Sequence, residues 1–548
     1  MTGRPRSILL LATLMLAAIP ALADSLLVNV NGYTWSADGA LQRFGALRFD
    51  ADGAVTATYA AGQHPADTGA AMLDGGGRTL IPGLIDAHGH VLNLGLLRSR
   101  VDLTGSKSLS EALQRIAAYA RQHPDVPWIL GRGWNQELWP ERKFPNAGDL
   151  DQLQLGRPIW LQRIDGHAAW ADSLAMKTAG ITKRTPDPHG GRILRDSRRR
   201  ATGIFIDNAE ALVDAAVPAP TPAQQRKALQ VALQQLASVG LTGVHDAGID
   251  LSTARLYRKM AAAGELPIRV YAMLSEQVSE GFGAPLVDDG RGFLTIRSIK
   301  VYLDGALGSR GAALLAPYSD ANDNTGLLFR QTDKFAGLVI AAQERGFQVN
   351  VHAIGDAANR VALDGFAAAP AATALRHRIE HAQVIALSDI PRFAGLGIIA
   401  SVQPTHATSD KNMAEDRVGS KRILGSYAWR RLLDAGARIA AGSDFPVEPE
   451  QPLYGLHAAV TRQDRDDQPP GGWYKEQALT LEEALRAFTL DAAYAAHQEQ
   501  HLGSLEPGKR ADFVLLDRDI FALPAAQIWQ ARVSETWVNG VCIYQAPN

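Results

Sequence analysis

The chain has a single cysteine, Cys542, so it cannot form an internal disulfide. Its charges nearly cancel, because 55 basic and 57 acidic side chains give a formal net charge of -2. A protein without excess positive charge has no electrostatic basis for binding nucleic acid or an anionic membrane surface. With 46% hydrophobic and 20% charged residues, the composition is that of an ordinary globular protein. We therefore expect a small-molecule partner and no nucleic acid.

Long apolar runs are also scarce, and the one at residues 8–19 is short for a membrane-spanning helix. Arg4 and Arg6 precede it, and Ala21-Leu22-Ala23 follows it as a small-x-small cleavage site. This order predicts a secretory signal peptide, residues 1–23, cut after Ala23; the alternative is an N-terminal membrane anchor. We expect no stable membrane insertion after cleavage. Export without disulfides suits a protein secreted across an inner membrane into a periplasm.

Short apolar stretches alternate with helical ones through the middle of the chain, which predicts a parallel sheet. Eight candidate strands can be counted: Leu84–His90, Gly240–Asp246, Ile268–Leu274, Ile296–Leu303, Phe347–His352, His377–His381, Ile398–Gln403 and Arg438–Ser443. Eight such units predict an α/β fold, a distorted TIM-like (β/α)8 barrel. The alternative, a doubly wound open sheet, needs a Gly-rich phosphate-binding turn after its first strand, and this chain lacks one.

Both ends of the chain have a different pattern, of short strands separated by turns. It fills residues 24–80 and resumes in residues 503–548. We predict one composite β-sandwich built from both termini; two unrelated β appendages are the alternative. Residues 81–502 would then form the barrel. The gap after its first strand is too long for a loop, so residues from about 95 to 235 are predicted to be an insertion that forms a lid over the barrel mouth.

Polar side chains occur where the apolar strands end. They are His88 and His90 in the first strand, Lys300 in the fourth, His352 in the fifth, His381 in the sixth and Asp444 after the eighth. Because strand ends of a barrel meet on one face, these side chains should converge. Each has a structural alternative: a histidine can simply be hydrogen-bonded, Lys300 can pair with Asp304, and Asp444 can cap a helix. Their joint occurrence in strand order favours a functional site over these structural roles.

Several motifs carry a resemblance to a known family: Pro82–His90, Lys300–Gly305, Val351–Asp356, Ile379–His381, Gly442–Pro446 and Gly503–Val514. On these motifs the chain, over essentially all of residues 25–548, resembles the amidohydrolase superfamily of metal-dependent hydrolases. It is most similar to the amidohydrolase-3 or YtcJ-like branch, which includes the N-substituted formamide deformylases. The resemblance places Arg163 and His167 in an insertion typical of that branch.

The resemblance implies a centre of two divalent metal ions, expected to be zinc. His88, His90 and Asp444 would hold one ion, His352 and His381 the other, and Lys300 would bridge them as a carbamate formed with carbon dioxide. A metal-bridging hydroxide would be the nucleophile, with Asp444 as general acid and base. Without the carbamate, the site would hold a single ion.

The implied reaction is hydrolysis of an amide-like C–N bond. Deaminases of the superfamily usually place a glutamate three residues after the fifth-strand histidine, and Gly355 stands there instead, which argues against deamination. The alternatives are an ester, lactone or phosphoester hydrolase with the same two-metal site, and, more distantly, a non-catalytic metal- or ligand-binding protein.

Candidate substrate contacts are Trp134, Arg163, His167 and His406, since aromatic walls and an arginine can hold an acyl or aromatic group and a carboxylate. For the tryptophan, the alternative is a place in the insertion's own core. Asp304 and Arg310 are expected to pair and support the loop after the fourth strand. Formation of a homo-oligomer stays open.

Overall fold

The structure, a computed structural model, describes residues 24–65, 69–164, 168–188, 190–369 and 373–547. Contacts divide the chain into two compact units. The first comprises Met1–Gly89, Leu236–Ala254 and Ala261–Asn548, and the second comprises His90–Gln235 and Arg255–Met260. Within the described ranges, no helix combines the length and apolar character that crossing a membrane requires. The predicted signal peptide, residues 1–23, lies outside them.

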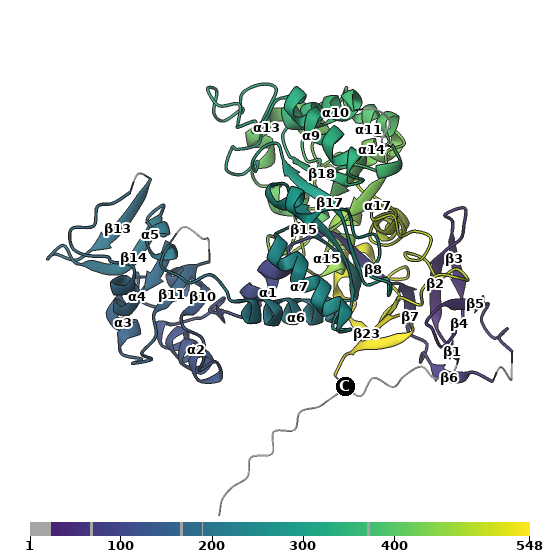
Figure 1. The fold of residues 1–548 in the computed structure, drawn as a ribbon, viewed down its shortest axis with the longest axis horizontal. Coiled ribbons are helices and arrows are strands. Elements are labelled where there is room, and N and C mark those ends of the chain that lie inside the picture. The colour runs from purple at the N-terminus through teal and green to yellow at the C-terminus, as the bar shows by residue number, and fades with distance from the viewer. Residues whose placement is uncertain (1–23, 66–68, 165–167, 189, 370–372, 548) are drawn as a thin grey trace, which may run out of the picture. The chain divides into compact units, whose positions relative to one another are not determined.

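The first unit contains an eight-stranded parallel sheet that curls into a nearly closed barrel (Figure 1). In the order β8, β15, β16, β17, β18, β19, β20 and β21, its strands are Leu84–Gly89, Leu241–Ile249, Arg269–Ser275, Leu294–Tyr302, Gln348–Ala353, Arg378–His381, Ile399–Val402 and Ile439–Ala441. Each overlaps one strand predicted from the sequence, so the predicted α/β barrel is confirmed. Because both faces of these strands are covered, they read as nearly continuous apolar runs.

Helices follow the barrel strands. They are α7 (Leu251–Ala262), α8 (Glu276–Ser279), α9 (Thr332–Glu344), α10 (Asp356–Ala368), α11 (Ile390–Leu396), α12 (Pro404–Asp410), α13 (Ala414–Arg422), α14 (Trp429–Asp434), α15 (Pro452–Thr461), α16 (Leu481–Ala487) and α17 (Leu490–Ala495). Local sequence sets several of their ends. Proline is the first residue of α12 and α15 and the second of α11, where its missing N–H costs no helical hydrogen bond. Figure 1 shows α9, α10, α11 and α14 grouped beside β18.

The barrel closes where the end of β21 meets the end of β8. The backbone N–H of Asp444 donates to the carbonyl of His88 at 2.7 Å, and Gly89 forms a β-bridge with Phe445. Gly442 permits this approach, because a Cβ there would lie 2.5 Å from both a carboxylate oxygen of Asp86 and the backbone nitrogen of His88. The two segments that carry His88 and Asp444 are therefore joined directly.

We expect Gly442→Ala to destabilise the protein by about 1–3 kcal/mol, the usual cost of overpacking a core, since backbone lies in the way of the added methyl. Gly337→Ala in α9 is the matched control: nothing lies within 4 Å of its added Cβ, and alanine favours the helix by up to about 1 kcal/mol. Thermal and urea unfolding followed by circular dichroism measure both. Equal midpoints for the two variants would contradict the close approach at Gly442.

The two ends of the chain share a β-sandwich beside the barrel. One sheet, in the order β5, β4, β1 and β6, holds Val55–Tyr59, Ala46–Phe49, Ser25–Val28 and Ala71–Asp74. The other, in the order β24, β23, β22, β7, β2 and β3, holds Val541–Gln545, Val533–Val538, Phe513–Leu516, Thr79–Pro82, Asn31–Trp35 and Leu41–Phe44. The C-terminal β22 pairs with the N-terminal β7, and Phe49, Leu80 and Phe513 share one core. The predicted composite sandwich is confirmed.

The second unit has its own sheet and core. Its sheet, in the order β13, β14, β12, β11, β10 and β9, holds Gly191–Arg195, Ala201–Asp207, Ala168–Ala171, Ile159–Arg163, Ile129–Trp134 and Val101–Asp102. Its helices are α1 (Val91–Arg98), α2 (Leu109–Gln122), α3 (Ala147–Asp151), α4 (Ser173–Thr178) and α5 (Ala211–Asp214); α6 (Pro222–Ser238) follows them and runs into the first unit.

Trp134 lies in the core of the second unit. Its indole is fully buried, donates to the carbonyl of Leu161 at 2.8 Å, and has the rings of Trp139 and Trp170 at 6.4 and 6.2 Å. This packing is that of a residue in the insertion's own core, the alternative stated for Trp134 above. Contact between Trp134 and a substrate stays a prediction.

Candidate metal centre

Three side chains from separate strand ends form a compact group of potential metal ligands. They are His88 in β8, His381 at the end of β19 and Asp444 after β21, and their ligand atoms all lie within 4.8 Å of one another. All three residues are buried. His381 and Asp444 have φ values of 73° and 63°, which residues other than glycine rarely adopt. Strained backbone of this kind persists only where the surroundings impose it, and it is commonest at functional sites.

Lys300 and His352 border the same group. Lys300 Nζ lies 3.0 Å from Nε2 of His88, and the ring centre of His352 lies 4.5 Å from that of His381. Burial lowers the pKa of Lys300 to about 8, which favours the neutral amine that a carbamate requires. The structure thus brings five of the six predicted ligands together. The sixth, His90, directly follows β8, is half-buried and begins the second unit, so its role as a ligand stays a prediction.

The hydrogen bonds at Nδ1 of two histidines fix which ring nitrogen carries the lone pair. Nδ1 of His88 is bonded to the carboxylate of Glu380, and Nδ1 of His381 faces Oε1 of Gln403 at 2.8 Å. Both Nδ1 atoms must donate to these oxygens, so the lone pair of each neutral ring is on Nε2. Burial and then Lys300 lower the pKa of His88 to about 4 and that of His352 to about 3. Neutral imidazole is the form that binds metals, so this donor set fits a divalent ion.

Glu380 and Arg378 form a buried charge pair behind the ligands. Arg378 Nε lies 2.8 Å from Oε1 of Glu380, and neither side chain is exposed. Burial alone would raise the pKa of Glu380, but Arg378 and His88 outweigh it and hold that pKa well below its usual range. Arg378 also donates to the carbonyl of Ala87 at 2.6 Å and to Oγ of Ser401 at 2.8 Å. The pair therefore ties β19 to β8 and β20 while it orients His88.

Asp86 supports the other side of the centre. It accepts from the backbone N–H of His88 at 3.0 Å and from the hydroxyl of Ser443 at 2.7 Å, and burial raises its pKa to about 7. Sequence reasoning assigned no role to Asp86 or Glu380. The available signal was a carboxylate inside an otherwise apolar strand, two residues before His88 in one case and one residue before His381 in the other.

Asp304 supports the segment after β18. The predicted pairing of Asp304 with Arg310 is wrong. Its carboxylate accepts from the backbone N–H groups of Ala313, Ile354 and Gly355 at 2.9, 3.0 and 2.7 Å, and burial raises its pKa to about 7. Arg310 pairs with Asp320 instead, at 3.1 and 2.8 Å. Three backbone donors satisfy Asp304 without Arg310, a solution that a sequence pattern does not reveal.

The remaining candidate substrate contacts belong to different parts of the chain. His406 lies in α12, with Nε2 3.7 Å from Oδ2 of Asp444 and its ring stacked at 6.0 Å on that of His381. Arg163 ends β11 in the second unit and is bonded to Gln136 at 2.9 Å. His167 lies outside the described residues.

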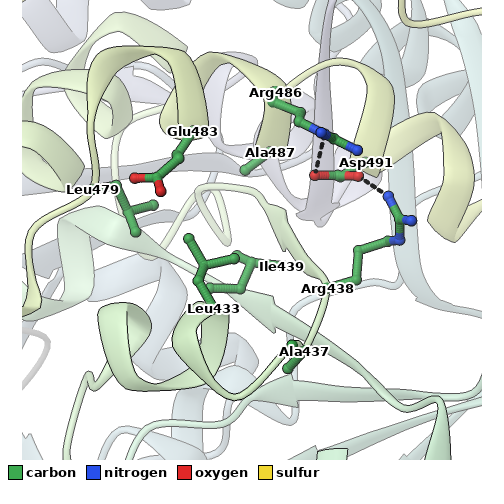
Figure 2. A pocket seen from close by; sticks show the side chains of 10 residues that line it. Leu433, Ala437, Arg438, Ile439, Leu479, Glu483, Arg486, Ala487 and Asp491 are labelled. Carbon is green, nitrogen blue, oxygen red and sulfur yellow. Dashed lines mark hydrogen bonds and ion pairs between the residues drawn. The ribbon is translucent and has the colours of Figure 1, made fainter. Parts of the chain in front are cut away.

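A separate cavity of about 400 Å³ opens at the start of β21, at the opposite end of that strand from Asp444 (Figure 2). Its charged lining residues all have charged partners: Arg438 and Arg486 pair with Asp491, and Glu483 pairs with Arg430. Figure 2 shows the guanidinium groups of Arg438 and Arg486 both directed at Asp491, and Arg486 Nε lies 3.2 Å from it. At this end of a barrel such pairs stabilise the fold, so we assign the cavity no chemistry.

Comparison with known proteins identifies the family of this chain. A family model described as "Amidohydrolase family" matches residues 71–544. The Bacillus subtilis (strain 168) protein "Putative amidohydrolase YtcJ" is 32% identical over 480 residues, which are 86% of this chain and 89% of that protein. The "N-substituted formamide deformylase" of Arthrobacter pascens is 29% identical over 500 residues, 87% of this chain and 90% of that one.

Among solved structures, an uncharacterized metal-dependent hydrolase from Pyrococcus horikoshii OT3 aligns with a TM-score of 0.76. It is 27% identical, and the alignment covers 92% of this chain and 99% of that one. The alignment therefore includes residues of both units.

Proposed function

The chain belongs to the amidohydrolase family, and from this premise we propose that it hydrolyses an amide-like C–N bond of a small molecule with the aid of divalent metal ions. The observation that carries the proposal is the group of His88, His381 and Asp444, buried at barrel strand ends with ligand atoms within 4.8 Å of one another. Active sites of barrel enzymes lie at this end of the strands.

We propose zinc as the metal and two ions as the full complement. His88, His90 and Asp444 would hold one, His352 and His381 the other, and a carbamate on Lys300 would bridge them. Bound ions supply a water-derived nucleophile at neutral pH and polarise the substrate carbonyl. The neutral amine that carbamate formation needs is supported by the lowered pKa of Lys300.

Asp444 is assigned the proton transfers. It takes a proton from the attacking water and passes it to the leaving nitrogen, so that one amide and one water give a carboxylic acid and an amine. Its carboxylate is placed for this by the backbone bond to His88 and by the neighbouring Ser443, which Asp86 holds.

Gly355 supports hydrolysis over deamination. A Cβ at this position would lie 1.9 Å from the carbonyl oxygen of Ala313, so no side chain fits without displacing backbone. The glutamate that deaminases of the superfamily place here has no room. An ester, lactone or phosphoester hydrolase with the same centre is the alternative, and substrate profiling separates the two.

The first test is metal content and turnover of the purified chain, prepared without chelator. Elemental mass spectrometry is expected to find about two zinc equivalents per chain. Because one relative is named for N-substituted formamides, a series of N-substituted formamides and longer N-acyl amines is the first panel, with matched esters and lactones beside it.

Three results would change the proposal. About one equivalent would indicate a single-ion site with Lys300 unmodified. A folded chain that takes up no added metal would refute the metal centre, and turnover confined to esters or lactones would select the alternative. Export to the periplasm is a separate proposal that rests on residues 1–23, and fractionation of expressing cells tests it.

A further inference from the structure

Two histidines beside the site are each held by a glutamine, but in opposite ways. Nδ1 of His381 faces the amide oxygen of Gln403 at 2.8 Å, whereas Nδ1 of His406 faces the amide nitrogen of Gln383 at 3.4 Å. All four residues are buried. A ring nitrogen that faces an amide oxygen must donate, and one that faces an amide nitrogen must accept, so the two pairs fix different tautomers.

The orientation of each amide is set by a second partner that can only accept. The amide nitrogen of Gln403 lies 3.4 Å from the carbonyl oxygen of Ser401, and that of Gln383 lies 3.3 Å from a carboxylate oxygen of Asp410. Turning either amide around would place oxygen against oxygen. His381 therefore carries its proton on Nδ1, and His406 carries its proton on Nε2.

Tyr427 completes the support of His406. Its hydroxyl donates to Asp410 at 2.6 Å, and its backbone N–H donates to the carbonyl of Gln383 at 2.6 Å. Burial and the charge of Asp410 raise the pKa of Tyr427 well above its usual range, so the phenol keeps the proton that it donates. Gln383, Asp410 and Tyr427 thus form a closed hydrogen-bonded group on the Nδ1 side of His406.

The other ring nitrogen of His406, Nε2, faces Asp444. Nε2 lies 3.7 Å from Oδ2 of Asp444, which is longer than a hydrogen bond, and it is buried without a hydrogen-bond partner in the described part of the chain. A buried N–H without an acceptor is costly. This donor beside Asp444 indicates that a bound molecule supplies the acceptor.

We propose that His406 is a catalytic residue that donates its Nε2–H to an oxygen of the bound substrate, and that Gln383, Asp410 and Tyr427 are positioning residues that hold this tautomer. The identity of the oxygen rests on the proposed function: in amide hydrolysis the carbonyl oxygen gains negative charge, which a fixed N–H stabilises. In this tautomer Nε2 of His406 has no lone pair, so His406, unlike His381, is not a further metal ligand.

Nitrogen NMR of the full-length chain labelled with ¹⁵N-histidine tests the tautomer, both before and after zinc is added. Loss of one ring signal in His406→Gln identifies His406. We expect its proton on Nε2 in the wild type and on Nδ1 in Gln383→Glu, because a carboxylate can only accept. Gln403→Glu is the matched control: it replaces an oxygen that already accepts, so His381 keeps its proton on Nδ1. A wild-type His406 protonated on Nδ1 would overturn the proposal.

Turnover of the best amide substrate tests the donation itself. Glutamine can place an N–H close to the position of Nε2, whereas leucine cannot. We expect kcat of His406→Gln to stay within about tenfold of the wild type and that of His406→Leu to fall about 100-fold or more, with equal zinc content in both. Equal losses in the two variants would refute donation. If the wild type hydrolyses no amide, the proposed function fails, while the NMR result still decides the tautomer.

Discussion

Asp444→Asn is expected to lower kcat for an amide substrate by about 10³-fold or more while the protein keeps its zinc. Asparagine has nearly the same shape and retains an oxygen that can face the metal, but it cannot accept the proton of the attacking water. The backbone of this segment, with its left-handed φ of 63° and its bond to His88, does not depend on the charge of the side chain. The loss should therefore appear in kcat rather than in folding.

Asp519→Asn is the control for the Asp444 variant. Asp519 lies in the sandwich part of the chain, where it accepts from Asn31 and Tyr33, so its amide should leave turnover unchanged. Circular dichroism and elemental mass spectrometry accompany the kinetics. Full turnover of Asp444→Asn would refute the proton-transfer role, and loss of zinc from it would mean that Asp444 acts mainly as a ligand.

The convergence of polar residues at the strand ends could be predicted because one physical rule applies to all of them. A fully buried parallel strand is an apolar run, and a polar residue where the run stops must be paired or bound to a metal. His88, His352, His381 and Asp444 obey this rule, and the barrel brings the ends of their strands together. The eight strands themselves were recognisable for the same reason.

The supporting residues could not be assigned in this way. Glu380 and Asp86 stood within the recognised motifs, but an inward-facing carboxylate and a solvent-facing one look alike until the strand register is known. The partners of His406 come from three separate segments. Gln383 follows the left-handed turn at His381 and Ala382, Asp410 ends α12, and Tyr427 precedes α14. Their meeting depends on backbone geometry that no spacing encodes.

Arg378→Met is expected to be the most destabilising of the single changes considered, at about 3–5 kcal/mol, because it leaves the carboxylate of Glu380 buried without its cation. The same change frees the carbonyl of Ala87 and Oγ of Ser401, which lie on the strands at either side. The apparent midpoint of thermal unfolding measures the effect. Arg330→Met is the matched control: its pair with Glu276 is about a quarter exposed, so it should cost at most about 1 kcal/mol.

The double variant Arg378→Met with Glu380→Gln separates charge from packing. The glutamine oxygen can still accept from Nδ1 of His88, and no buried charge remains, so we expect at least half of the lost stability to return. Affinity for zinc, measured by competition with a chelator, should fall about 10- to 100-fold, because a neutral amide makes His88 a weaker ligand than a carboxylate does. Additive losses in the double variant, with zinc affinity unchanged, would show that Arg378 and Glu380 act independently of each other and of the metal centre.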